Sequence, residues 1–235
     1  MSSILEGFSQ AFSLILHLDA ELLGIILLSI KVSGCALIIA TITGLPIGAV
    51  LGLGKFPMKE TSITILNTFM GLPPVVVGLF LYLLLSRSGP LGFMSLLYTP
   101  TAMILAQSVL AFPIVASISH SAIAGVDPII KQASSTLGAT PLQVSWTVIT
   151  EARYGIMSGV IAAFGRVMAE VGSILIVGGN IAGYTRVMTT TIALETDKGN
   201  FELALALGVI LLSISLIINV ALHFVQKKGT AGLRR

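Results

Sequence analysis

The feature that most constrains this chain is a series of apolar runs, each long enough to cross a bilayer. A helix of about 20 apolar residues spans the hydrocarbon core. Only 10% of the 235 residues are charged, whereas a soluble domain carries about 25%. The sequence therefore predicts an all-α, polytopic integral membrane protein, with one transmembrane domain over residues 1–235 and five transmembrane helices. The runs cover residues 32–54, 63–86, 101–124, 154–177 and 201–225.

The segment ahead of the first run is shorter and more polar. Residues 4–18 are apolar but are interrupted by Glu6, Ser9, Gln10 and His17. A segment of this kind lies along the membrane interface more readily than across the bilayer. We therefore expect an N-terminal interfacial helix, and a sixth span is the open alternative.

The second run is interrupted by Gly71-Leu72-Pro73-Pro74. A proline inside a helix removes a backbone hydrogen bond. Within a bilayer, the freed backbone groups must find partners in neighbouring protein or in water. Pro73 and Pro74 therefore predict a helix break that lines a pathway or gate.

Arg166 and Glu170 lie four residues apart inside the fourth run. Charged side chains at membrane depth are costly and usually face the interior of a helix bundle. One interpretation is an ion pair between successive turns that locks helix packing. The other makes Arg166 part of an anion path or of a gate.

A second polar cluster follows the fourth run. Glycines allow close approach of the backbone, and hydroxyls with one arginine suit a weakly basic oxyanion. We expect an outer face that contacts an anion or its binding protein; an ordinary outer loop rich in turn residues is the alternative. The cluster contains Asn180, Thr185, Arg186, Thr189, Thr190 and Thr191.

The longest polar interval, residues 127–151, lies between the third and fourth runs. Asp127 and Pro128 form a helix start, and Thr140-Pro141 repeats it. Gly138 stands where a left-handed residue would end the first helix. Two short helices joined by a bend are therefore predicted. A plain linker is the alternative, although linkers seldom carry this much structure.

Several kinds of catalytic and ligand site have no counterpart in the sequence. The single Cys35 excludes an intrachain disulfide, and the three histidines show no ligand spacing. The nearest P-loop candidate has Ala49 in place of its first glycine and Phe56 in place of its Ser or Thr. We therefore expect no enzymatic activity, no metal and no bound cofactor. Any ATP and Mg²⁺ would be used by a separate ATPase polypeptide.

Basic residues predict the orientation of a five-span chain. The net charge of +3 concentrates at the C-terminus, which fits membrane topology better than a nucleic-acid partner. By the positive-inside rule, the central loop and C-terminus are cytoplasmic and the N-terminus is outside. The inner side would hold Lys55, Lys59, Lys131, Arg153 and four basic residues at the C-terminus.

The central loop resembles the "EAA" loop of ABC-importer permeases. Gln132-Ala133-Ser134 precedes Gly138 by three residues, and nine more lead to Val148-Ile149-Thr150-Glu151. The spacing, Ala133 and Gly138 match strictly. Gln132 replaces the glutamate of the motif, and Glu151 replaces its proline. The resemblance implies that Gln132, Ala133, Ser134, Leu137 and Gly138 couple the chain to an ATPase.

Further stretches resemble the tungstate-type permeases of ABC importers, relatives of molybdate and sulfate permeases. That resemblance implies a type I ABC-importer permease fold in the inner membrane of a prokaryote. It implies a second copy of the chain, an ABC ATPase homodimer and an extracytoplasmic oxyanion-binding protein as partners, with tungstate imported by alternating access. The stretches are GLPPVVVGLFLYLLLSRSGPLG, LAFPIV, AAFGRVMAEVGS, GGNIAGYTRVMTTTIALETDKG and FELALALG.

Other functions stay open at this point. A molybdate or sulfate permease is the nearest alternative, because the binding protein largely selects among similar dianions. An ion-coupled secondary transporter is an alternative of another class, and it would need ionisable groups at the bilayer midplane. A purely structural membrane subunit fits the proline-broken run poorly.

Overall fold

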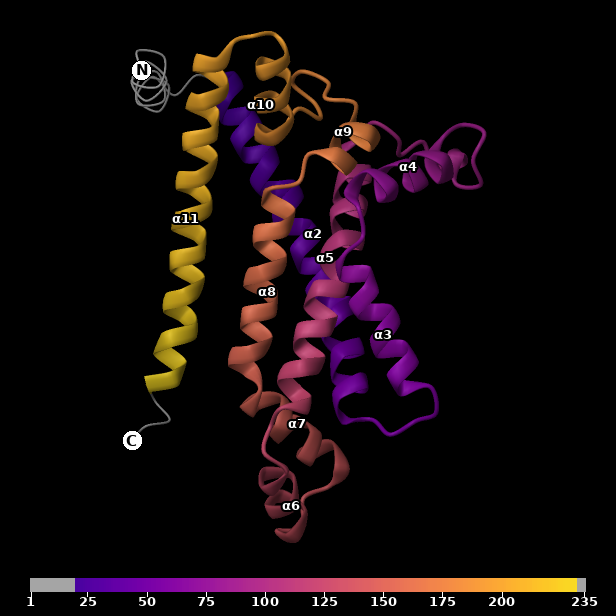
Figure 1. The fold of residues 1–235 in the computed structure, drawn as a ribbon, viewed down its shortest axis with the longest axis vertical. Helices are drawn as coiled ribbons and strands as arrows, with labels where there is room; N and C mark the ends of the chain where they lie inside the picture. The colour runs from indigo at the N-terminus through magenta and orange to yellow at the C-terminus, as the bar shows by residue number, and fades with distance from the viewer. Residues whose placement is uncertain (1–19, 232–235) are drawn as a thin grey trace.

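The computed structural model describes residues 20–231, so the helix expected over residues 4–18 lies outside the described part. Ten α-helices and one short 3-10 helix make up these residues, with no strand among them (Figure 1). In chain order they are α2 (Ala20–Leu53), α3 (Lys59–Met70), α4 (Pro74–Leu85), η1 (Gly92–Met94), α5 (Pro100–Ala124), α6 (Pro128–Thr136), α7 (Pro141–Glu151), α8 (Arg153–Met168), α9 (Gly172–Gly178), α10 (Met188–Asp197) and α11 (Phe201–Ala231).

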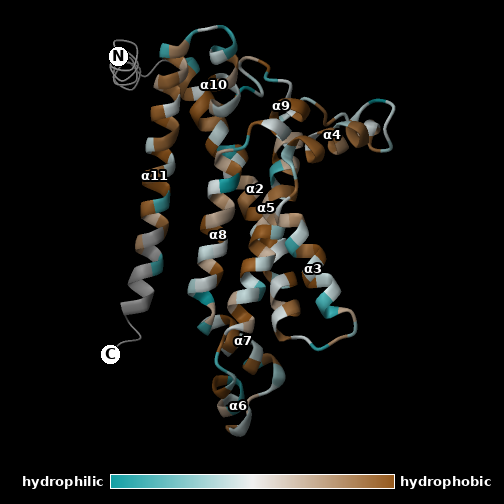
Figure 2. Ribbon diagram, in the orientation of Figure 1, coloured by the Kyte–Doolittle hydropathy of each residue, from teal (hydrophilic) through white to brown (hydrophobic). Residues whose placement is uncertain are grey.

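Three helices, α2, α5 and α11, are each long and apolar enough to cross a membrane alone. Two pairs, α3 with α4 and α8 with α9, reach that length only when each bent pair counts as one span. Residues 20–231 therefore contain three to five candidate spans. Figure 2 shows apolar residues along most of α2 and α11, with hydrophilic residues in the connections at the two ends.

The structure confirms one predicted break and adds another. The pair α3 and α4 is bent by 98° at residues 71–73, where the prolines predict a break. The fourth predicted span, over residues 154–177, is broken where the sequence predicted no break, because α8 ends at Met168 and α9 follows after a bend of 58°. The first span is also longer than predicted, since α2 begins at Ala20 and continues through Lys31.

The long helices pack closely because small residues face one another. A Cβ atom placed on Gly48 of α2 would lie 2.6 Å from the backbone oxygen of Ala116 on α5. One placed on Gly52 would lie 2.6 Å from the Ile123 side chain. Glycine at these positions therefore lets α2 and α5 approach to backbone contact.

The connections gather at two ends of the bundle (Figure 1). The loop end holds α6, α7, the connection from α2 to α3 and the last turns of α11. The opposite end, which we name the α10 end, holds α10, α9, α4 and the start of α2. Each group of candidate residues therefore belongs to one end or to the helix breaks between them.

Candidate functional site

The two helices of the central loop begin at the predicted cap residues. The carboxylate of Asp127 accepts a hydrogen bond of 2.9 Å from the amide of Ile129. Thr140 and Gln143 form a reciprocal capping box at the start of α7, with the Gln143 side chain accepting from the Thr140 amide at 2.8 Å. Both helix starts thus satisfy amides that have no partner inside the helix.

Gly138 forms the predicted bend between α6 and α7. Its φ is +82°, in the left-handed region where a side chain is strained. The amides of Gly138 and Ala139 donate to the carbonyls of Ser135 and Ser134, both at 3.1 Å. This pair of hydrogen bonds is a Schellman motif, and it fixes the direction in which the chain leaves α6.

The central loop leaves large apolar side chains uncovered. Leu137 is 88% exposed, Leu142 81%, Trp146 71% and Ile129 66%. Large apolar side chains that are exposed together on a protein surface mark sites of protein or membrane contact. The loop therefore has the character of a docking surface.

The residues expected to couple the chain to an ATPase lie on this surface. Gln132, Ala133, Leu137 and Gly138 are all exposed. Ser134 is half-buried, and its hydroxyl donates to the carbonyl of Ile130 at 2.8 Å. Ser134 therefore supports α6, while the other four are accessible to a partner.

The two helix breaks lie against each other. Pro73 precedes α4 and is exposed, and Pro74 occupies its first position. A Cβ atom on Gly78 of α4 would lie 2.9 Å from the Cα atom of Ser173 on α9. Because α4 and α9 touch at backbone distance, the two short helices beyond the breaks form one packed unit.

Arg166 and Glu170 do not form the ion pair that their spacing predicts. Lys198 with Glu195 is the ion pair found within residues 20–231. Arg166 instead donates to the carbonyl of Leu72, at the break between α3 and α4, over 3.4 Å. The spacing argument fails because the helix ends at Met168, before a further turn can align the two side chains.

Glu170 acts on the backbone of its own break. The side chain is 4% exposed, and its carboxylate accepts hydrogen bonds from the amide of Ser173 at 2.9 Å and from its hydroxyl at 3.3 Å. The Thr189 hydroxyl donates to the Glu170 carbonyl at 2.8 Å. These contacts satisfy groups that the break removes from the helix ladder.

The threonines of the outer cluster point inward. Thr185, Thr189, Thr190 and Thr191 are between 0% and 8% exposed, and their hydroxyls all donate to backbone carbonyls. These four hydroxyls are therefore engaged within the chain, and their contribution to an outer face for an anion or its binding protein stays a prediction. They hold the turns around α10, as an ordinary structural loop would.

Arg186 keeps access to open space at the α10 end. It lines a cavity of about 440 Å³ together with Lys31 and Tyr184. Its Nε atom is buried without a hydrogen-bond partner among the described residues, as is Oδ1 of Asn180. Of the predicted outer cluster, Arg186 is thus the cation that borders a cavity.

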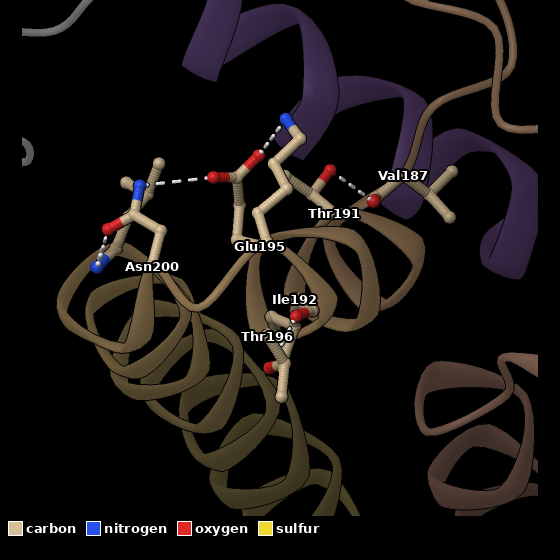
Figure 3. Close-up of polar contacts among 8 residues, drawn as sticks. Val187, Thr191, Ile192, Glu195, Thr196 and Asn200 are labelled. Atoms are coloured by element: carbon tan, nitrogen blue, oxygen red, sulfur yellow. Dashed lines mark hydrogen bonds and ion pairs between the residues drawn. The ribbon is translucent and has the colours of Figure 1, made fainter.

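Glu195 is a polar centre that the sequence pattern did not single out. Its carboxylate accepts from Lys198 at 2.8 Å and from Asn200 at 3.1 Å (Figure 3). The hydrogen bond from Lys198 is the main reason that the pKa of Glu195 is lowered from its ordinary value. This group ties the end of α10 to the start of α11.

Two buried polar contacts at membrane depth were also missed. The Gln107 side chain, 1% exposed, donates to the carbonyl of Val167 at 2.9 Å. The Ser29 hydroxyl accepts from the amide of Met188 at 2.9 Å. A polar residue inside an apolar run was the available signal; the first contact stabilises the end of α8 and the second stabilises the start of α10.

The described residues contain no group of three or more His, Cys, Asp and Glu side chains arranged to hold a metal ion. Most of the polar contacts described above satisfy helix ends, caps and breaks. The arrangement can therefore support movement of helices and docking of a partner.

Comparison with known proteins places this arrangement in a family. The chain is 42% identical over 228 residues to the tungstate uptake system permease protein TupB of Peptoclostridium acidaminophilum, covering 97% of this chain and 100% of that protein. It is 45% identical over 203 residues to a probable anion ABC transporter permease protein of Haloferax volcanii, covering 84% and 88%.

The fold has relatives among solved structures. A chain of the MetNI methionine ABC transporter in an inward-facing conformation superposes with a TM-score of 0.70, covering 92% of this chain and 98% of that one at 17% identity. The model of the family "binding-protein-dependent transport system inner membrane component" matches residues 44–229. The chain is therefore a multi-pass membrane permease of that family, with the type I ABC-importer permease fold.

Proposed function

We propose that this chain is the membrane-spanning subunit of an ATP-driven importer of an oxyanion, tungstate above all. The observation that carries the proposal is its 42% identity, over almost the whole chain, to a tungstate uptake permease. As a transport subunit the chain itself performs no bond chemistry.

The partner at the loop end is an ABC ATPase homodimer, which binds ATP and Mg²⁺ itself. The exposed apolar residues of α6 and α7, with Leu137 at 88% and Trp146 at 71% exposure, supply the anchors that such docking needs. Movement of the ATPase dimer is passed to the spans through this loop, giving alternating access.

A second copy of the chain completes the pore, and the loop end is cytoplasmic. Basic residues support this orientation, since Lys55, Lys59, Lys131 and Arg153 lie at that end. The membrane is the inner membrane of a prokaryote. The N-terminus and the α10 end then face the extracytoplasmic binding protein that delivers the anion.

Co-purification and uptake measurements test this function. The chain, expressed with an ABC ATPase and an oxyanion-binding protein from its own genome, should purify with both and should take up tungstate into proteoliposomes only with ATP. Competition by molybdate and sulfate then ranks the three anions. Uptake driven by an ion gradient without an ATPase would overturn the proposal in favour of a secondary transporter.

Replacement of Arg186 tests the function of the α10 end separately. It borders an open cavity with Lys31, and we expect Arg186→Ala to lower oxyanion uptake while assembly with the ATPase stays intact. Normal uptake at limiting anion concentration would make this end an ordinary loop. Thr196→Val, at an exposed position of the same region, is the matched control.

A further inference from the structure

One face of α3 is polar and exposed, although α3 forms with α4 a bent pair that is a candidate membrane span. Its polar residues are Glu60, Thr61, Thr64, Asn67 and Thr68, all of them exposed. Their spacing of three and four residues places them along one side of the helix. Leu66, on the opposite side, is 6% exposed and packs into the core.

If the bent pair of α3 and α4 crosses the membrane as one span, this polar face lies within the bilayer. The 12 residues of α3 rise by about 18 Å at about 1.5 Å per residue, more than half of a hydrocarbon core of about 30 Å. The helix starts at the loop end, where the Lys59 side chain donates to the carbonyl of Gly54 at 3.1 Å. Its last residue and the break at Gly71 therefore lie near the middle of the membrane.

The polar face is poorly suited to contact with lipid. The hydroxyls of Thr64 and Thr68 donate to carbonyls four residues earlier, at 2.9 Å and 2.8 Å, so these two are satisfied in any surroundings. Asn67 differs: its side-chain oxygen accepts from the Ser117 hydroxyl. Its side-chain nitrogen has no hydrogen-bond acceptor among the described residues. An exposed amide group without a partner requires water or another polar group.

A positive charge stands at the far end of this face. Arg166 reaches the carbonyl of Leu72, directly after Gly71, at 3.4 Å. No carboxylate in the described part of the chain lies within 4.0 Å of its guanidinium. An arginine without an anionic neighbour at membrane depth is a binding group for an anion.

We propose that the exposed polar face of α3 lines the water-filled, loop-side half of the oxyanion path, which ends at Arg166 near the bilayer midplane. This inference rests on the proposed function for the identity of the anion. The side-chain amide of Asn67 can donate a weak hydrogen bond to a hydrated dianion, water solvates the threonine hydroxyls, and Arg166 provides the one strong contact. The dianion can therefore pass along the face without being held tightly.

The same helix offers an internal reference. Ile65 is 50% and Phe69 46% exposed, yet both line an apolar groove with Pro46 and Phe112. This second exposed face has the chemistry of lipid contact. At similar depth, α3 thus presents one side for water and another for hydrocarbon.

Thiol labelling of the assembled transporter distinguishes the two faces. In a variant whose single cysteine is removed by Cys35→Ser, the substitution Asn67→Cys should react with an anionic, membrane-impermeant thiosulfonate. Ile65→Cys should react at least about tenfold more slowly, because the reactive thiolate forms only in contact with water. Equal rates at the two positions would overturn the inference, as would a disulfide joining Asn67→Cys between two copies.

Anion passage is tested by protection and by uptake. Tungstate should slow the labelling of Asn67→Cys, and Arg166→Gln should abolish that protection. Asn67→Leu should lower tungstate uptake at least about tenfold, whereas Ser117→Ala, which removes only the hydrogen bond between the two side chains, should leave uptake near normal. A complex that imports tungstate with Asn67→Cys unlabelled would refute this path and leave the proposed function intact. Labelling of Asn67→Cys in a complex that takes up no oxyanion would refute the proposed function and leave the water-filled face of α3 intact.

Discussion

Replacement of Gly138 tests whether the bend of the central loop transmits movement to the spans. The residue has a φ of +82°, and an added Cβ would meet no atom within 4 Å. Substitution therefore causes no clash, and its cost is the left-handed backbone alone. That cost is about 1–2 kcal/mol for alanine and is higher for a β-branched side chain.

This magnitude is small for the fold and large for the loop. A cost of about 1–2 kcal/mol changes the population of a conformation by roughly 5- to 30-fold. Because a side chain at Gly138 would contact no atom of the spans, the chain can relieve the strain by turning α6 away while the spans stay packed. We therefore expect Gly138→Val to insert and assemble normally and to lose coupling, with Gly138→Ala intermediate.

The assay is ATP hydrolysis by the reconstituted complex, stimulated by the liganded binding protein, together with a pull-down of the ATPase. Gly199→Ala is the matched control, since its φ is +77° and its surroundings are equally open, but it lies between α10 and α11. Full stimulated hydrolysis and transport by Gly138→Val would refute the role of the loop. An equal loss in Gly199→Ala would show that general strain is responsible.

Three further predictions follow from the breaks and the α10 end. Since Arg166 and Glu170 have separate partners, their neutral replacements should have additive effects on melting temperature; coupling in a double-mutant cycle would contradict the geometry. Thr189→Val leaves the Glu170 carbonyl without its donor and should lower stability by about 1–3 kcal/mol, measured by thermal unfolding in detergent. The pKa of Glu195 is lowered from 4.5, chiefly by the hydrogen bond from Lys198. The ionised carboxylate therefore stabilises the folded protein fully above pH 4.5, and this stabilisation is lost as the pH falls through the lowered pKa. Lys198→Met should therefore flatten the fall in melting temperature on acidification, and an unchanged pH profile would exclude this pair as its source.

The central loop could be predicted from the sequence because its structure is local. Asp127, Gly138 and Thr140 each act on backbone groups within a few residues, so cap and turn preferences suffice. The break at Pro73 and Pro74 is equally local, because proline cannot continue a helix in any surroundings.

The break after Met168 could not be predicted in this way. No proline marks it, and it is held by contacts distant in sequence, such as the bond from Thr189 to the carbonyl of Glu170. The ion pair expected between Arg166 and Glu170 required an unbroken helix, and it does not form because the helix ends at Met168. Burial of the threonines beyond this break is likewise a property of the packed bundle, which residue type does not reveal.

The exposure of Trp146 makes the chain its own optical reporter. The sequence contains a single tryptophan, and it lies on α7 with 71% of its surface exposed. Its emission therefore comes from the central loop alone, without interference from the spans. A shift of that emission to shorter wavelength when an ATPase covers the indole would report docking in real time, in the unmodified protein and without any dye.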